Sequence, residues 1–203
     1  MEQRRPVLTE SAVLAALAHP VRLDVLNYLM SAGPATASVC ARAVGDTPSN
    51  CSYHLRVLAR LGLVEADESG DGRERPWRAT VTGFSIGDPP PGDPAVAGGA
   101  AGAGEQAGAG EQAGAALRAA SLQLDQRLAR DYLAGRDQAP PAWRAADAYA
   151  AYTLRATPRE LAELVACLDA LIRPLIAATR DDPPADAELV HVGVQAFPRL
   201  GRS

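Results

Sequence analysis

Residues 45–64, G-D-T-P-S-N-C-S-Y-H-L-R-V-L-A-R-L-G-L-V, contain the pattern that decides the fold of the N-terminal part of the chain. Gly45 suits the end of one helix, Asp46 or Thr47 can cap the next, and Pro48 suits the first helical position, where its missing N–H would be unpaired anyway. Apolar residues then recur at helical spacing on one face: Cys51, Leu55, Leu58 and Leu61. The glycine that follows closes this helix, and an extended segment begins after it.

The other face of the same helix is polar. Its short hydrogen-bonding side chains and single guanidinium are of the kind that reaches base edges and phosphates in a DNA major groove. Asn50 is suited to reading adenine, and Arg56 to contacting guanine or phosphate. The candidate DNA-contacting set on this segment is Thr47, Ser49, Asn50, Ser52, Tyr53 and Arg56. An ordinary surface helix is the alternative interpretation, and the neighbouring elements argue against it.

Three shorter helical patterns precede this segment and a hairpin pattern follows it. The helices are predicted to begin at Thr9 or Ser11, at Pro20 after His19, and at Thr36 or Ser38. Extended segments at 63–67 and 75–81 flank an acidic, glycine-containing turn at 68–72. Three helices, a recognition-type helix and a hairpin predict a winged helix-turn-helix domain at residues 1–86, with the hairpin as the wing.

Residues 87–114 differ sharply in composition from what precedes them. They are rich in glycine, alanine and proline, and A-G-A-G-E-Q occurs twice in tandem at 101–112. A segment with so little apolar surface cannot offset the entropy lost on ordering, so we expect a flexible linker here.

Residues 115–203 are predicted to form a small α+β unit. A leucine-bearing helix is expected at 115–133, a strand at 147–156 and a buried alternating strand at 189–197. Thr157-Pro158-Arg159-Glu160 is a capping box that begins a long apolar-striped helix. The chain as a whole is therefore expected to be mainly α with α+β character.

Two stretches of the first 86 residues carry a family resemblance. H-P-V-R-L-D-V-L-N-Y-L at 19–29, followed by S-N-C-S-Y-H-L-R-V-L-A-R-L-G-L-V at 49–64, resembles the ArsR-like winged helix-turn-helix transcriptional regulators. The resemblance covers about residues 10–82. The tail, with T-P-R-E-L and V-H-V-G-V-Q-A-F-P-R, is similar to the C-terminal regions of related actinobacterial-type regulators.

This resemblance implies a homodimer that binds a near-palindromic operator in double-stranded DNA. The polar set on 45–64 would face the DNA, and Arg73 and Arg75 near the wing tip would reach its backbone or minor groove. Metal-sensing members use a cysteine pair in the third helix, whereas Cys40 stands alone here. We therefore expect no metal or other cofactor, and we assign Cys40 and Cys51 to the core.

The charge distribution is also compatible with a function other than specific DNA binding. The chain has no lysine, and residues 1–84 hold nine arginines and nine acidic residues, so DNA binding has to come from local placement of arginines. Five of those carboxylates lie in the wing region. A winged-helix module that binds protein partners without specific DNA binding is therefore the alternative. An enzyme is not expected, since His19, His54 and His191 are scattered and form no nucleophile–base set.

The remaining expectations concern location and assembly. Charged residues and a proline interrupt the apolar run at 161–178, and the three cysteines lack metal or redox spacing, so a cytoplasmic, nucleoid-associated protein without a membrane span is expected. The stripe on the helix from Pro158 to about Ala178 predicts that 115–203 dimerises the protein and holds any small-molecule effector. The alternative is that the first helix alone makes the dimer.

Overall fold

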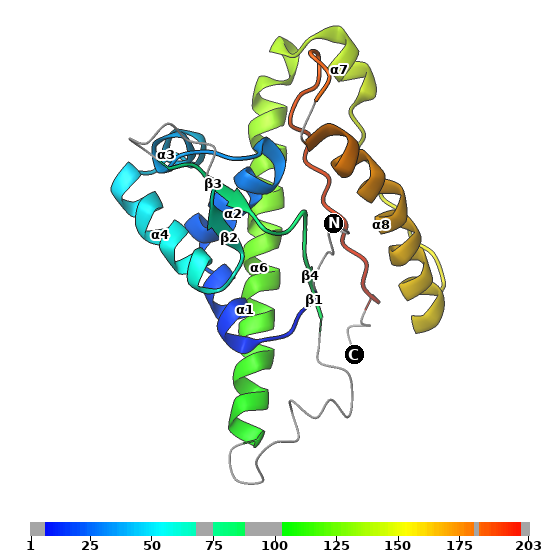
Figure 1. The fold of residues 1–203 in the computed structure, drawn as a ribbon. Coiled ribbons are helices and arrows are strands. Elements are labelled where there is room, and N and C mark those ends of the chain that lie inside the picture. The colour runs from blue at the N-terminus through cyan, green and yellow to red at the C-terminus, as the bar shows by residue number, and fades with distance from the viewer. Residues whose placement is uncertain (1–6, 68–74, 88–102, 181–182, 200–203) are drawn as a thin grey trace. The chain divides into compact units, whose positions relative to one another are not determined.

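The computed structural model describes residues 7–67, 75–87, 103–180 and 183–199. The chain forms two compact units, residues 1–124 and 125–203, and one long helix, α6 (Ala103–Gly135), contributes to both. The first unit holds the winged-helix elements, which Figure 1 shows as a group of short helices with a small hairpin.

The N-terminal unit contains the four predicted helices in the predicted order, and they confirm the expected winged helix-turn-helix architecture. They are α1 (Ser11–Leu17), α2 (Pro20–Ala32), α3 (Ala37–Val44) and α4 (Pro48–Arg60). Their apolar stripes meet in one core, in which Leu17, Leu26 and Leu55 are fully buried. Because each stripe has helical spacing, burying it fixes which face of α4 is left for a partner.

The turn between α3 and α4 is set by local backbone chemistry. Gly45 ends α3 in the left-handed region, at φ 70°, and its N–H bonds to the Ala41 carbonyl. The Thr47 side chain accepts the backbone N–H of Asn50 at 3.3 Å and so caps α4, with Pro48 in the first turn. A side chain at position 45 would strain this backbone, so the glycine determines how α4 follows α3.

The predicted hairpin is present as two short antiparallel strands, β2 (Val64–Ala66) and β3 (Trp77–Ala79). Their register pairs Val64 with Ala79 and Ala66 with Trp77. The other edge of β3 is also paired, since Ala35 and Trp77 exchange two backbone hydrogen bonds of 3.0 and 2.8 Å. The acidic turn at 68–72 lies outside the described residues.

A second strand pair was not predicted. β1 (Val7–Leu8) runs parallel to β4 (Ser85–Ile86) and joins the beginning of the winged-helix segment to its end. Two-residue strands carry no periodicity that a sequence pattern could reveal.

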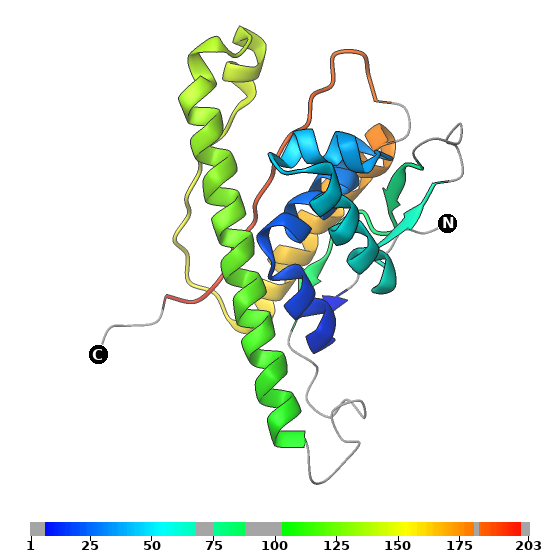
Figure 2. The same ribbon diagram turned by 90° about the vertical axis from the view of Figure 1, so that its left-hand side faces the viewer.

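Helix α6 begins earlier than expected. It starts at Ala103, so residues 103–114, which were assigned to the flexible linker, are helical. Residues 88–102, the rest of that segment, lie outside the described residues. Alanine is the best helix former, and the helix gains packing further along, where Leu117, fully buried, and Leu124 join the winged-helix core. Figure 2 shows the N-terminal half of α6 beside α1.

We predict that Leu117→Ala destabilises the N-terminal unit by about 2–5 kcal/mol, because it leaves a cavity where a fully buried side chain was. Urea unfolding followed by circular dichroism measures this loss. Leu133→Ala, at a position that is 52% exposed on the same helix, is the matched control and should cost less than about 1 kcal/mol. Equal losses for the two variants would show that α6 does not dock on the winged-helix core.

The second unit is mostly helical. The end of α6 is followed by a 3₁₀ turn, η1 (Arg136–Gln138), then α7 (Pro141–Ala146) and α8 (Pro158–Arg180). The capping box of α8 is present as predicted. Thr157 N–H donates to Glu160 Oε2 at 2.7 Å, and Glu160 N–H donates to Thr157 Oγ1 at 3.3 Å. The bonds that Glu160 Oε2 accepts from the Thr157 N–H, and from the Thr157 hydroxyl at 2.7 Å, lower the pKa of Glu160.

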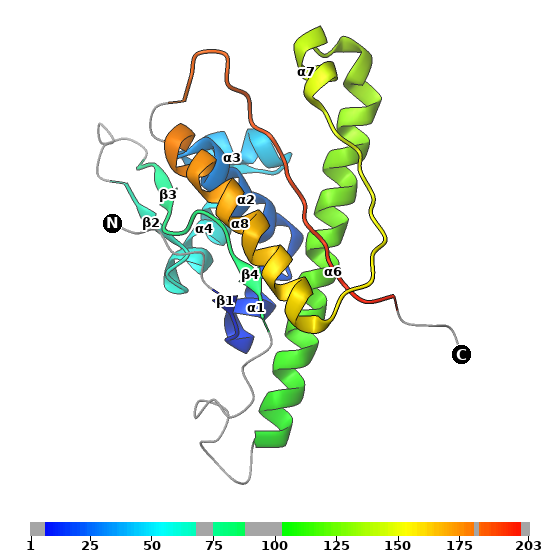
Figure 3. The ribbon, with the colours of Figure 1, turned by 90° about the vertical axis from the view of Figure 1, so that its right-hand side faces the viewer.

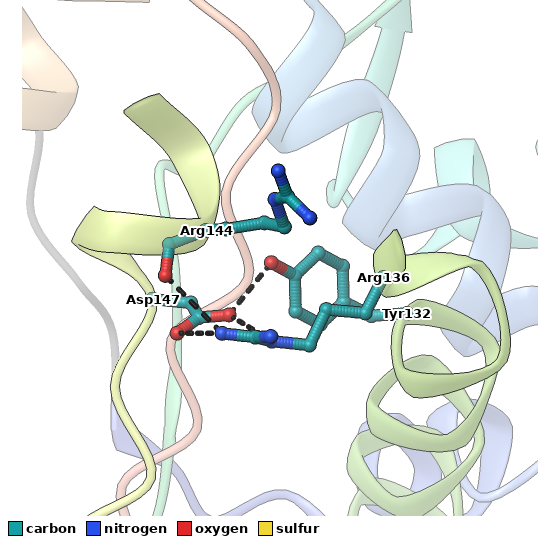
Figure 4. A network of polar contacts seen from close by, with 4 residues as sticks. All are labelled: Tyr132, Arg136, Arg144 and Asp147. Carbon is teal, nitrogen blue, oxygen red and sulfur yellow. Dashed lines mark hydrogen bonds and ion pairs between the residues drawn. The ribbon is translucent and has the colours of Figure 1, made fainter. Parts of the chain in front are cut away.

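Asp147 ties the chain after α7 back to α6, as Figure 4 shows. Its Oδ2 accepts hydrogen bonds from Tyr132 Oη at 2.8 Å and Arg136 Nε at 2.7 Å. Arg136 also donates to the Arg144 carbonyl at 3.2 Å. The bonds from Arg136 and Tyr132 hold the pKa of Asp147 below its usual value, so this tie is in place at neutral pH.

The two strands predicted in the tail are absent from the described residues. Both 147–156 and 189–197 are extended but unpaired, and Figure 3 draws them as plain chain. The alternating side chains of the second segment are not buried, since Val190 is 61% and Val192 60% exposed. The prediction of a buried strand was wrong for the isolated chain, because alternation specifies an apolar face but not what covers it.

Asp125 of α6 holds the last described segment. Its carboxylate bonds His191 Nε2 at 2.8 Å and Gln195 Nε2 at 2.5 Å. Gly193 lies so close that a Cβ there would be 3.1 Å from this carboxylate. His191, which is exposed, therefore joins this segment to α6 through Asp125.

Candidate nucleic-acid interface

Helix α4 divides cleanly into an inner and an outer face. Cys51, Leu55 and Leu58 are fully buried against α2 and α3. The outer face carries the predicted polar set, of which Thr47, Ser49, Tyr53 and Arg56 are exposed and Asn50 and Ser52 are half-buried. The structure therefore brings all six predicted residues of 45–64 together at one helix surface.

The Asn50 side chain is held in place by Asp46, the residue before the N-cap Thr47. Its side-chain N–H donates to Asp46 Oδ2 at 2.7 Å, and Asp46 Oδ1 accepts the Thr47 backbone N–H at 2.6 Å. These two bonds, first that from Thr47, lower the pKa of Asp46, which stays ionised at neutral pH. The Asn50 carboxamide keeps its carbonyl and a second N–H for a partner, so Asp46 orients the Asn50 side chain, which the sequence did not reveal.

Arg56 and Ser52 form the second fixed pair. Arg56 Nη2 donates to Ser52 Oγ at 3.0 Å, one turn apart on the exposed face. This contact directs the guanidinium along the helix, and it uses only one of the five N–H donors of the arginine.

The structure describes one of the two predicted wing arginines. Arg75 is exposed, as a backbone contact requires, while Arg73 lies outside the described residues. Arg78 of β3 is paired with Glu65 of β2 at 2.7 Å, which neutralises one wing cation locally.

A groove lies between α4 and β3, and sequence reasoning missed three of its lining residues, Ala59, Arg60 and Trp77. It measures about 530 Å³ and is lined by Tyr53, Arg56, Ala59, Arg60 and Trp77. Arg60 follows Tyr53 by seven residues and Arg56 by four, which is a helical stripe and could have been detected. Trp77 reaches the groove from another element, and no pattern within α4 could indicate it.

Two histidines, one buried and one half-buried, lie behind the outer face of α4. The rings of His19, the N-cap residue of α2, and His54 of α4 have centroids 4.6 Å apart. His54 is 3% exposed. Among the described residues, neither His19 Nδ1 nor His54 Nδ1 has a hydrogen-bond partner. Burial, and then the nearby His19 and Arg22, lower the pKa of His54 despite the opposing charge of Asp46, so it packs as a neutral ring.

This arrangement predicts acid sensitivity. The folded protein binds a proton at His54 less readily than the unfolded chain does, so stability falls as pH drops below about 6.5, the ordinary histidine value. We expect the free energy of unfolding to decrease more between pH 7.5 and 5.5 for the wild type than for His54→Gln. His191→Gln, in the other unit, is the control. Identical pH dependence in wild type and His54→Gln would contradict the assignment.

The cysteines of the first unit lie in the core, as expected. Cys40 and Cys51 are both fully buried. Burial raises the pKa of the Cys40 thiol to about 11, and it also raises that of Cys51, so both remain protonated thiols at neutral pH. In the part of the chain that the structure describes, no three His, Cys, Asp or Glu side chains are grouped so that they could hold a metal ion. Over the same residues, no helix is long and apolar enough to cross a membrane.

Comparison with known proteins agrees with this geometry. Residues 17–66, from the end of α1 through β2, match the family described as a helix-turn-helix domain. Residues 17–66 thus form a helix-turn-helix domain, and the comparison supports the resemblance to ArsR-like regulators that the sequence motifs indicated.

The similarity extends to a particular regulator. Over 60 residues, 30% of this chain, the sequence is 43% identical to the HTH-type transcriptional regulator NmtR of Mycobacterium tuberculosis (strain ATCC 25618 / H37Rv). That stretch covers 49% of NmtR, so the chain spans about half the length of the curated relative it matches.

Proposed function

We propose that this protein is a transcriptional regulator that binds duplex DNA in a sequence-specific manner through α4. The observation that carries the proposal is the division of α4, with an apolar face buried in the core and a polar, Arg-bearing face left exposed. A rigid helix held by three neighbours can enter a major groove and present several side chains to base edges at once. The match to a helix-turn-helix domain supports this assignment.

The interface residues divide into two roles. Asn50 and Arg56, each fixed by a local hydrogen bond, are the proposed base readers. Thr47, Ser49, Ser52 and Tyr53 add phosphate and sugar contacts, and Arg75, with Arg73, reaches the flanking backbone from the wing. Because the first 84 residues are neutral overall, these local contacts rather than bulk charge provide the affinity.

We further propose that a second copy of this chain binds the second unit. On α8, Leu171 is 71% and Leu175 66% exposed, and Phe197 of the last segment is 72% exposed. Exposed apolar stripes of this kind mark interfaces. A symmetric homodimer would cover them and present two copies of α4 to a near-palindromic operator. A small-molecule effector, if the protein responds to one, would act on this unit.

The alternative is a winged-helix module that binds a protein partner and no specific DNA. The observations that favour it are the neutral N-terminal half and the paired Arg78 in the wing. The polar outer face of α4 opposes it, since a protein-binding helix would present apolar anchors there. A regulator of this kind acts by binding, and we propose no catalytic activity.

A binding titration distinguishes the two functions. Duplexes retained by the protein from a random pool are sequenced, and the enriched duplex is titrated at fixed salt against a shuffled version. Specific recognition predicts that the enriched duplex binds about a thousandfold more tightly or better. Failure to enrich any sequence, or equal affinity for both duplexes, would support the protein-binding module instead.

A further inference from the structure

The groove beside α4 includes the proposed base reader Arg56 and adds two side chains that the proposed readout does not use, Arg60 and Trp77. Its lining combines two aromatic rings, Tyr53 and Trp77, with the guanidinium groups of Arg56 and Arg60. Among the described residues, no carboxylate lines it. An apolar floor between cations suits a ligand that alternates apolar and anionic parts, as deoxyribose and phosphate do along a DNA strand.

The floor of the groove is held rigidly. Trp77 is paired in register with Ala66 of β2, and on its other edge it exchanges two backbone hydrogen bonds with Ala35. Its side chain also packs against the winged-helix core. The Trp77 backbone is paired on both edges and the side chain packs on the core. The ring therefore loses little conformational entropy when a ligand contacts it.

The position of the groove along α4 indicates which part of DNA it would meet. Arg60 is the last residue of α4, whereas the proposed base readers Asn50 and Arg56 lie in its first and third turns. A helix whose N-terminal part enters the major groove leaves that groove across the flanking strand. Arg60 and β3 therefore lie where a sugar–phosphate backbone would pass.

We propose that Arg60 and Trp77 form a backbone clamp in which Arg60 binds one phosphate and the Trp77 ring packs on the adjoining deoxyribose of duplex DNA. The clamp rests on the proposed function. It positions the protein on the duplex and carries no sequence information, so it should act equally on all duplexes.

Salt-dependent binding titrations test the clamp. Dissociation constants for the enriched and shuffled duplexes are measured over a range of salt for the wild type, Arg60→Gln and Arg130→Gln. Arg130, on α6 in the other unit, is the control for loss of one positive charge. Arg60→Gln should weaken binding to both duplexes and reduce the slope of log K against log salt by about 1, whereas Arg130→Gln should leave the slope unchanged.

Substitutions of Trp77 test whether its ring contributes to DNA affinity. Trp77→Leu should raise the dissociation constant for both duplexes without changing the salt slope, and Trp77→Phe should restore most of the affinity. Thermal melting identifies any loss of folding in these variants. Affinities of the folded Trp77→Leu equal to those of the wild type would overturn the assignment of the ring.

Three outcomes separate this inference from the function on which it rests. If wild type discriminates between the duplexes but Arg60→Gln behaves like Arg130→Gln, the clamp is wrong and the regulator assignment stands. If wild type binds neither duplex, both fail. If Arg60→Gln changes the oligomeric state in light scattering and leaves the salt slope unchanged, the groove is a protein interface and the clamp is wrong.

Discussion

The double substitution Asn50→Ala/Arg56→Ala should abolish sequence discrimination while the protein remains folded. Each bidentate base contact contributes roughly 1–3 kcal/mol of discrimination, so losing both should cost about 2–6 kcal/mol. The two contributions should add, because Asn50 bonds Asp46 whereas Arg56 bonds Ser52, and the pairs share no partner. The measurement is the ratio of dissociation constants for the enriched and shuffled duplexes at fixed salt.

The matched control removes the same residue types from other helices. Asn27→Ala/Arg130→Ala alters α2 and α6 and should leave the ratio unchanged. Thermal melting of both double variants verifies folding. If the α4 variant retains wild-type discrimination, α4 does not read the bases, whatever else the protein binds.

The second large effect concerns assembly. Leu171→Asp/Leu175→Asp places two charges on the apolar stripe of α8, where the isolated protomer leaves both side chains mostly exposed. The protomer should therefore fold, while the dimer loses its interface. Sedimentation velocity should show a monomer. Loss of the second half-site contact should reduce affinity for a two-half-site duplex by roughly a hundredfold or more.

Substitutions on α8 test the proposed dimer interface better than truncation of the chain does. Removing everything after residue 86 would also remove Leu117, which completes the winged-helix core, so unfolding would be mixed with loss of dimerisation. Ala166→Asp/Ala170→Asp adds the same two charges to exposed positions on the opposite face of α8 and should remain dimeric. A Leu171→Asp/Leu175→Asp protein that stays dimeric would favour the first helix as the dimer interface.

Sequence reasoning succeeded where local chemistry decides the structure. Gly45, Thr47 and Pro48 act within one turn of the chain, and each does in the structure what its type predicts. The Thr157–Glu160 capping box is equally local. The outer face of α4 followed from the same reasoning, because helical spacing assigns its residues to faces directly.

Sequence reasoning failed where the structure of a segment depends on residues outside that segment. Residues 103–114 form the start of α6, a helix whose packing depends on Leu117, beyond the segment itself. The alternation at 189–197 predicts an apolar face, but burial of Val190 and Val192 needs a covering surface that the described chain does not supply. Trp77 joined the site through the hairpin register, which single-segment patterns do not contain.

A methylation-protection footprint on the enriched duplex tests the central claim most directly, because it reports contact with guanine N7 in the major groove. Two copies of α4 on one DNA face predict two protected clusters about 34 Å apart, roughly one helical turn. In Asn50→Ala/Arg56→Ala both clusters should disappear. A wild-type protein that binds the duplex but protects no major-groove guanine, or protects the same guanines after this double substitution, would contradict recognition of DNA by α4.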